Sequence, residues 1–204
     1  MSLLNAMKVG DFFYVWVDSI AVDSDGGRHH VQKLFPLPFA RGVFAVRGEQ
    51  SKVPAALAGQ YLTDRWGISF DEVLKTFPTL LQKCHDELAD HLQDRAGLEA
   101  VGQEIVLVGW SDERNAPVCM LALREAGQSV FYFTEKPTGF VSPDPGHDPS
   151  QQQRKENIMR TVWDIASAQS IQERRLDPSV SIGGHVTVAV VGQRQVHLWN
   201  IGDA

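Results

Sequence analysis

The chain has 204 residues, 43% of them hydrophobic, and a formal net charge of −6, which suits one domain with a sizeable core. The sequence contains no run of about 18 apolar residues free of charge, so we expect no membrane span. The acidic balance and the scattered basic residues argue against a nucleic-acid partner. Because Cys84 and Cys119 form no CxxC pattern and no signal peptide is recognisable, we expect free thiols in a cytoplasmic protein.

Short strands are expected in the first quarter of the chain. Residues 12–18 (FFYVWVD) are aromatic and β-branched, which favours a strand, and residues 22–27 (VDSDGG) have the composition of a turn. Residues 32–38 and 42–46 indicate two further strands. Gly48 follows as the end of this part of the chain.

Two helices are expected next. The first covers residues 53–65, and the second begins at Ser69, because Glu72 three residues later completes a capping-box pattern. The apolar side chains of the second helix recur at helical spacing. They are Val73, Phe77, Leu80, Leu81, Cys84, Leu88 and Leu92.

The second half of the chain returns to strands. We expect them at residues 104–110, 118–124 and 129–134, separated by polar turns. Residues 137–149 contain four of the ten prolines and are expected to form a loop.

One more helix and a hairpin complete the expected elements. Asp148 and Pro149 fit an N-cap and first-turn pair, so a helix is expected over residues 150–174. Residues 181–191 and 195–201 are expected to form a hairpin around Gly192. Because runs of strands alternate with runs of helices, the order predicts an α+β fold with largely antiparallel sheets in a single domain over residues 1–204.

This order resembles the four-layer αββα sandwich of proteasome subunits and related bacterial peptidases, the proteasome-like N-terminal-nucleophile (Ntn) hydrolases. The residues that carry the resemblance are a strand that ends in Asp18-Ser19, a strand that opens with Lys33, and a strand that ends at Gly48. Residues 181–184 (SIGG), followed by an apolar strand, look like the final strand of that family.

The resemblance implies a set of site residues. Carried over by position, Ser2 is the nucleophile, Asp18 the acid, Lys33 the lysine, and Gly48 the donor of an oxyanion-hole N–H. Ser2 lies sixteen residues before Asp18, and Lys33 lies fifteen residues after it, which is close to the spacing of the family. The resemblance further implies a homo-oligomer, a peptide or protein substrate, an ATP-dependent unfoldase as a partner, and no cofactor.

Such a set of residues has a clear chemical logic. A free α-amino group has a pKa near 7.7–8.0, so it can accept the proton of its own hydroxyl at neutral pH. A nearby lysine favours the deprotonated hydroxyl, and an aspartate keeps that lysine charged and oriented. This chemistry requires that Met1 be removed, because otherwise the Ser2 nitrogen is an amide.

Other interpretations of these residues stay open. Ser2 can be an unstructured terminal residue, Asp18 a residue at the end of a strand, Lys33 a solvent-facing strand residue, and Gly48 a plain turn. The chain can then be a catalytically inactive proteasome-like subunit with a structural or assembly role. Arg47 before the glycine is in keeping with that alternative.

Histidines offer a third, weaker alternative, a metal-dependent enzyme. His29 and His30 are adjacent, so in a strand they point to opposite faces. His85 and His91 are six residues apart and lie on different faces of a helix, while Cys84 belongs to the apolar stripe of that helix. The spacing therefore predicts no metal site.

Overall fold

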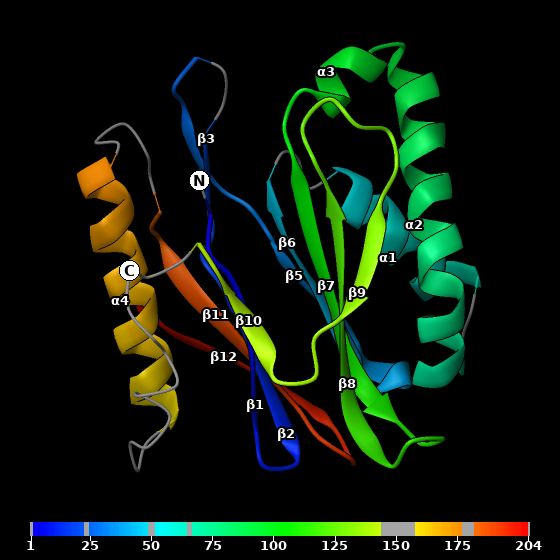
Figure 1. The fold of residues 1–204 in the computed structure, drawn as a ribbon, viewed down its shortest axis with the longest axis vertical. Helices are drawn as coiled ribbons and strands as arrows, with labels where there is room; N and C mark the ends of the chain where they lie inside the picture. Colours follow the sequence, from blue (N-terminus) through cyan, green and yellow to red (C-terminus); the bar gives the residue numbers. More distant parts are fainter. Residues whose placement is uncertain are drawn as a thin grey trace.

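The computed structural model describes residues 2–22, 25–48, 52–64, 67–143, 158–176 and 182–203. In these ranges the chain forms an α+β fold in which all paired strands are antiparallel. Figure 1 shows α4 (Ile158–Leu176) on one side, two sheets in the middle, and α1 (Lys52–Asp64) and α2 (Phe70–Leu92) on the other side. The predicted α+β class with antiparallel sheets is confirmed.

The first sheet combines strands from the beginning, the middle and the end of the chain. Its spatial order is β10 (Gly139–Ser142), β1 (Leu4–Val9), β2 (Phe12–Val17), β11 (His185–Val191) and β12 (Val196–Asp203). Strand β1 lies inside this sheet because it pairs with β2 on one side and with β10 on the other. The ends of β1 and β2 are therefore fixed by neighbours that lie far away in sequence.

The second sheet is built from the middle of the chain. Its order is β5 (Leu34–Leu37), β6 (Gly42–Gly48), β7 (Gln103–Ser111), β8 (Ala116–Arg124) and β9 (Tyr132–Glu135). A separate two-stranded ribbon joins β3 (Ile20–Val22) to β4 (Arg28–His30). A 3₁₀ turn (Pro38–Ala40) lies between β5 and β6, and α3 (Arg95–Glu99) follows α2.

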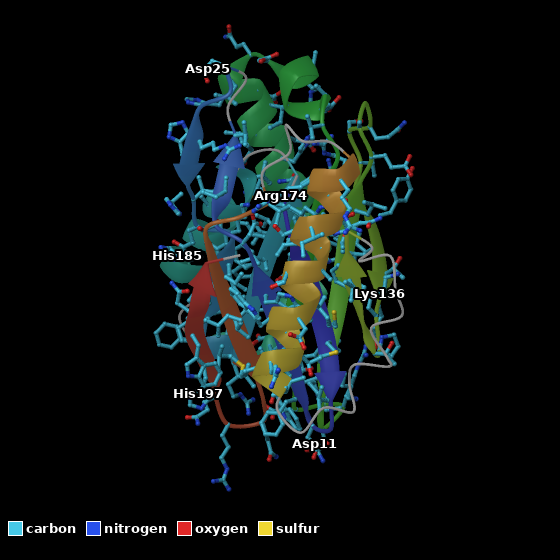
Figure 2. All side chains as sticks on the ribbon, turned by 90° about the vertical axis from the view of Figure 1, so that its left-hand side faces the viewer. Asp11, Asp25, Lys136, Arg174, His185 and His197 are labelled. Atoms are coloured by element: carbon cyan, nitrogen blue, oxygen red, sulfur yellow. The ribbon has the colours of Figure 1, made fainter. Side chains whose placement is uncertain are left out.

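Helix α4 covers the outer face of the first sheet, as the side view in Figure 2 shows. Its buried residues Val162, Ile165 and Ala166 belong to one apolar cluster with Met7 and Trp16 of the sheet. Helical spacing places these three α4 residues on one face, so burial of this face holds the helix against the strands.

A pair of buried amides also fastens α4 to the first sheet. Asn5 of β1 and Gln169 of α4 are both fully buried, and each donates a 3.0 Å hydrogen bond to the carbonyl oxygen of the other. The oxygen of Asn5 also accepts from the backbone N–H of Ser142 in β10. Because buried amides are costly without partners, these bonds fix how α4 lies relative to β1 and β10.

Strand β6 shows how one strand serves two cores. Val43 and Ala45 belong to the apolar cluster between the two sheets, whereas Phe44 and Val46 belong to the cluster under α1 and α2. This alternation follows from the two-residue period of a β-strand. It places the next odd-numbered residue, Arg47, on the face toward the first sheet.

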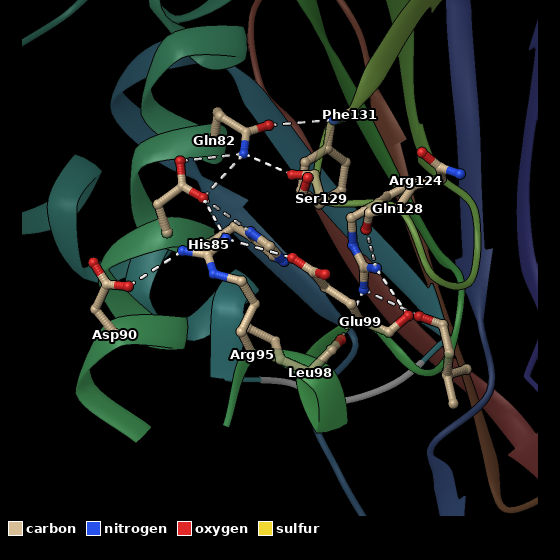
Figure 3. Close-up of polar contacts among 12 residues, drawn as sticks. Gln82, His85, Asp90, Arg95, Leu98, Glu99, Arg124, Gln128, Ser129 and Phe131 are labelled. Carbon is tan, nitrogen blue, oxygen red and sulfur yellow. Dashed lines mark hydrogen bonds and ion pairs between the residues drawn. The ribbon is translucent and has the colours of Figure 1, made fainter. Parts of the chain in front are cut away.

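Several sequence-based expectations require correction. Strands β1 and β10 were not predicted, and β10 lies in residues 137–149, which were expected to be a loop. The strand expected over residues 129–134 begins only at Tyr132. The side chain of Gln82 explains this difference, because it bonds the carbonyl of Ser129 and the N–H of Phe131 in place of a neighbouring strand (Figure 3).

The helical predictions are largely confirmed where the structure describes them. Ser69 caps α2, its side chain accepts from the N–H of Glu72, and the Glu72 carboxylate accepts from the Ser69 N–H. Cys84 is buried in the core, as expected. The proposed helix start at Asp148 and Pro149 lies outside the described residues. None of the described helices has an apolar stretch of the length needed to cross a bilayer.

A buried arginine organises the corner between α2, α3 and β8 (Figure 3). Arg124 is only 1% exposed, and its guanidinium donates to the carbonyl oxygens of Leu98, Glu99, Val101 and Gln128. Carbonyl dipoles therefore solvate this charge in place of water.

His85 of α2 belongs to the same corner. Its ring packs edge-on against Phe131, at 5.8 Å between ring centroids, and Phe131 also lies under the Arg124 guanidinium. Burial lowers the pKa of His85, against the opposing effect of Asp86. The neutral imidazole avoids a second buried cation beside Arg124.

A carboxylate at the start of α2 holds the turn between β7 and β8. Asp71 accepts from the hydroxyl of Ser111 and from the backbone N–H groups of Asp112 (3.0 Å) and Glu113 (3.2 Å). Burial opposes ionisation, but these hydrogen bonds outweigh it and lower the pKa of Asp71 below its usual value near 3.8.

We predict that Asp71→Asn lowers the free energy of unfolding by about 1–3 kcal/mol at neutral pH, because an amide nitrogen cannot accept these bonds. The folded-state pKa is the lower one, so the contribution is present above pH 3.8 and is lost as pH falls through the folded value. Urea unfolding at several pH values should show the difference from wild type shrinking on acidification. Asp90→Asn, at an exposed position of the same helix, is the control, and equal effects of both variants would contradict the prediction.

Candidate active site

Three of the four residues that the resemblance singled out meet at one point. Lys33 Nζ donates to Ser2 Oγ and to Asp18 Oδ1, in both cases at 2.9 Å. Ser2 is separated from β1 by Leu3, Asp18 directly follows β2, and Lys33 directly precedes β5. The site therefore lies where the first sheet and the second sheet come together.

Lys33 has a full set of acceptors. Besides Ser2 and Asp18, its ammonium group donates to the backbone carbonyl of Ile20. Three acceptors match the three N–H groups of a protonated lysine. The backbone carbonyl of Lys33 accepts from the N–H of Val46 at 2.9 Å, which extends the ladder between β5 and β6 and fixes the residue.

Lys33 and Asp18 form a buried ion pair, with 5% and 0% of their side chains exposed. Burial lowers the pKa of Lys33, and the charge and hydrogen bond of Asp18 counteract this effect. Burial likewise raises the pKa of Asp18, while Lys33 and two backbone donors counteract it. The alternative interpretation of Lys33 as a solvent-facing strand residue is wrong, because its side chain is buried in the protein.

Backbone groups complete the surroundings of Asp18. Its Oδ1 accepts from the N–H of Leu3 at 2.8 Å, and its Oδ2 accepts from the N–H of Gly183 at 3.4 Å. Gly183 belongs to the segment just before β11 that the resemblance also singled out. Asp18 thus connects the start of β1, the end of β2 and the start of β11.

Gly48 is placed differently from the other three residues. In the part of the chain that the structure describes, no hydrogen bond joins Gly48 to Ser2, Asp18 or Lys33. Its φ is +102°, and an added Cβ would lie 2.1 Å from the carbonyl oxygen of Gly102. Close contact between two backbones therefore explains why this position holds glycine.

The contact between Arg47 and Ser2 was not predicted from the sequence. Arg47 Nε donates to the backbone carbonyl oxygen of Ser2 at 2.8 Å, and its Nη1 lies 3.2 Å from Glu104 Oε2. The alternation of β6 places Arg47 on the face toward the first sheet. Its bond to Ser2 depends on the packing of the two sheets, which no local pattern in the sequence reveals.

The described residues contain no group of three or more His, Cys, Asp or Glu side chains arranged to hold a metal ion. Two exposed histidines, His30 and His185, stack at 5.3 Å between ring centroids next to the site. The hydroxyl of Ser19 lies 2.9 Å from His30 Nδ1 and accepts from the N–H of His185. These contacts join the β3–β4 ribbon to the start of β11.

Comparison with known proteins supports the fold. No family model and no curated protein matches the chain. Among solved structures, the chain is similar to Anbu (ancestral beta-subunit) from Yersinia bercovieri, with a TM-score of 0.63 and 13% sequence identity. The match covers 99% of this chain and 87% of that chain. At this identity the likeness concerns the fold alone, and it supports a proteasome-like fold.

We predict that Lys33→Met lowers the free energy of unfolding by about 3–5 kcal/mol, because it leaves the buried Asp18 carboxylate without its cation. The double variant Asp18→Asn/Lys33→Met should recover a large part of this loss, since no buried charge then remains. Chemical unfolding at neutral pH measures both.

Lys75→Met is the matched control, because Lys75 pairs with Glu113 on the surface, where both side chains are more than 60% exposed. This variant should change stability little. If Lys33→Met and Lys75→Met had the same effect, the buried pair would not stabilise the fold in the way described.

Proposed function

We propose that this chain is a proteasome-like Ntn hydrolase that cleaves peptide or amide bonds with Ser2 as its N-terminal nucleophile. The observation that carries the proposal is the position of Lys33 Nζ, 2.9 Å from both the Ser2 hydroxyl and the Asp18 carboxylate. The likeness to Anbu and the order of helix, two sheets and helices in Figure 1 support a four-layer αββα sandwich as the scaffold.

The reaction begins with activation of Ser2. Removal of Met1 leaves a free α-amine, which accepts the hydroxyl proton as Oγ attacks the carbonyl carbon of the substrate. Because the three N–H groups of Lys33 already have acceptors, Lys33 acts as a fixed cation that stabilises the developing charge on Oγ, and the amine is the base.

A backbone N–H stabilises the oxyanion of the tetrahedral intermediate, and Gly48 is the proposed donor. The intermediate then collapses to an ester of Ser2. The C–N bond of the substrate breaks, and the leaving amine takes the proton that the α-ammonium group holds. A water molecule attacks the Ser2 ester with the α-amine again as base, which releases the carboxylic acid and restores the hydroxyl.

The proposal extends to the partners of this chain. The name of Anbu describes it as a beta-subunit, and proteasome relatives assemble into rings. We therefore propose a homo-oligomer that acts on peptide or protein substrates, with an ATP-dependent unfoldase as a partner.

One observation favours a second candidate, an inactive subunit with an assembly role. Asp18 and Lys33 tie β1, β2, β5 and the segment before β11 together, whether or not chemistry takes place. The same contacts would then be kept for the fold alone.

Covalent labelling of Ser2 by an electrophile distinguishes the hydrolase from the inactive assembly subunit. The chain is prepared with Ser2 as its first residue and treated with a peptide epoxyketone, which needs both a hydroxyl and a free α-amine. Intact mass should increase by one probe, and Ser2→Ala should abolish the increase. Ser129→Ala, at an exposed position in the loop before β9, should label like wild type. If the wild-type chain takes no probe, the hydrolase proposal fails and the assembly role remains.

A further inference from the structure

A single peptide group next to the proposed nucleophile is held at both ends. The carbonyl oxygen of Ser2 accepts from Arg47 Nε at 2.8 Å, and the N–H of Leu3 donates to Asp18 Oδ1 at 2.8 Å. A peptide group is planar, so two such bonds fix the orientation of its plane. The direction of the Ser2 Cα–Cβ bond is then restricted, with Oγ beside Lys33.

Arg47 reaches Ser2 because a carboxylate positions it. Glu104 of β7 lies directly opposite Arg47 of β6 in the ladder, and Arg47 Nη1 is 3.2 Å and 3.3 Å from its two carboxylate oxygens. These side chains are 18% and 24% exposed, so solvent screens the pair less than a surface pair. The pair therefore directs the guanidinium from the second sheet toward the first.

A hydroxyl from the first sheet completes this arrangement. Ser142 Oγ accepts from Arg47 Nη1 at 2.6 Å and donates to Glu104 Oε2 at 2.9 Å. Ser142 lies on β10 and is paired with Leu4 of β1. It is therefore fixed next to the start of β1, close to Ser2. Arg47, Glu104 and Ser142 thus form one network across both sheets.

We propose that Arg47 is a positioning residue for Ser2, which orients the nucleophile through its carbonyl and keeps its α-amine in the free, proton-accepting form to lower pH. The proposal rests on the proposed hydrolase function. Arg47 contacts the main chain of Ser2 and not Oγ, so it acts through the position of Ser2.

The charges of Arg47 and Glu104 affect protonation of the Ser2 α-amine in opposite directions. The charged groups that contact Ser2 and Leu3 in the described structure are Lys33, Arg47 and Asp18. Asp18 is paired with Lys33, and Glu104 is paired with Arg47. A nearby cation disfavours the ammonium form of the Ser2 α-amine, and a nearby anion favours it. Loss of Arg47 leaves Glu104 uncompensated, whereas loss of the Glu104 charge leaves Arg47 uncompensated.

The test measures the rate constant for epoxyketone labelling of Ser2 against pH in chains that begin at Ser2. We expect Arg47→Met to reduce the maximal rate constant by about 10- to 100-fold, because a small displacement of a reacting group is enough for such a loss. The acid limb of its pH–rate profile, where the Ser2 α-amine becomes protonated, should move to higher pH. Glu104→Gln keeps one oxygen that can accept from Arg47, so its maximal rate should fall less than that of Arg47→Met, while its acid limb moves to lower pH.

Two further variants separate position from charge. Arg47→Lys keeps the cation but not the geometry, so it should lower the maximal rate and leave the acid limb near wild type. Arg114→Met is the matched control, because Arg114 forms an ion pair with Glu135 at half-exposed positions elsewhere, and it should alter neither quantity. Thermal unfolding of each variant checks that it is folded.

The outcomes are distinct. If wild type labels and the Arg47 variants lose thermal stability but keep the rate and pH profile of wild type, Arg47 is only structural and this inference is wrong. If Arg47→Met and Glu104→Gln shift the acid limb in the same direction, the electrostatic part is wrong. If wild type takes no probe, the hydrolase proposal itself fails, and this inference fails with it.

Discussion

The buried ion pair between Asp18 and Lys33 is the contact on which the arrangement of the two sheets at this end of the molecule depends. Two charges leave water only where hydrogen bonds compensate for the loss of solvation. Here the compensation comes from Leu3, Ile20 and Gly183, which belong to different segments of the chain. The pair therefore requires that β1, β2, β5 and the segment before β11 all be in place. A displacement of any one of them would expose or orphan a charge.

This requirement explains how structure and chemistry are connected here. The contacts that hold the sheets together are the same contacts that place the Ser2 hydroxyl beside an ammonium group. Arg47 adds a second connection of this kind, because its ion pair belongs to the second sheet while its Nε bonds the main chain that leads into the first. Stability and the geometry around Ser2 are thus difficult to change independently.

Much of the fold was predictable because many segments carry strong local patterns. The capping box at Ser69 and the apolar stripe of α2 come directly from helical geometry, and the strands β2, β6, β7 and β11 are rich in β-branched and aromatic residues. Strand β8 was predictable as an apolar run between polar turns. Strand β1 (LNAMKV) was missed because it contains only one β-branched residue, and its strand conformation depends on its two neighbours. Strand β10 is four residues long and follows a segment with turn composition.

The candidate site was predictable only through a resemblance. No local rule brings Ser2, Asp18 and Lys33 together, since their contact depends on how β1, β2 and β5 meet. The interaction of Arg47 with Ser2 was beyond reach even with the resemblance, because it depends on the register of Arg47 opposite Glu104 and on the spacing of the sheets. The resemblance gave Gly48 a role in the oxyanion hole, and the structure adds a packing reason for a glycine at this position, the close approach of the Gly102 carbonyl.

The place of β11 in the first sheet has a consequence for the order of events during synthesis. Strand β2 is translated before its neighbour β11, and the Gly183 N–H that bonds Asp18 lies 165 residues further along the chain. Contacts between residues so distant in sequence form late in folding. The surroundings of Ser2 are therefore incomplete while the chain is still being made. A nascent chain cannot complete the contacts around Asp18 until Gly183 and β11 have been translated.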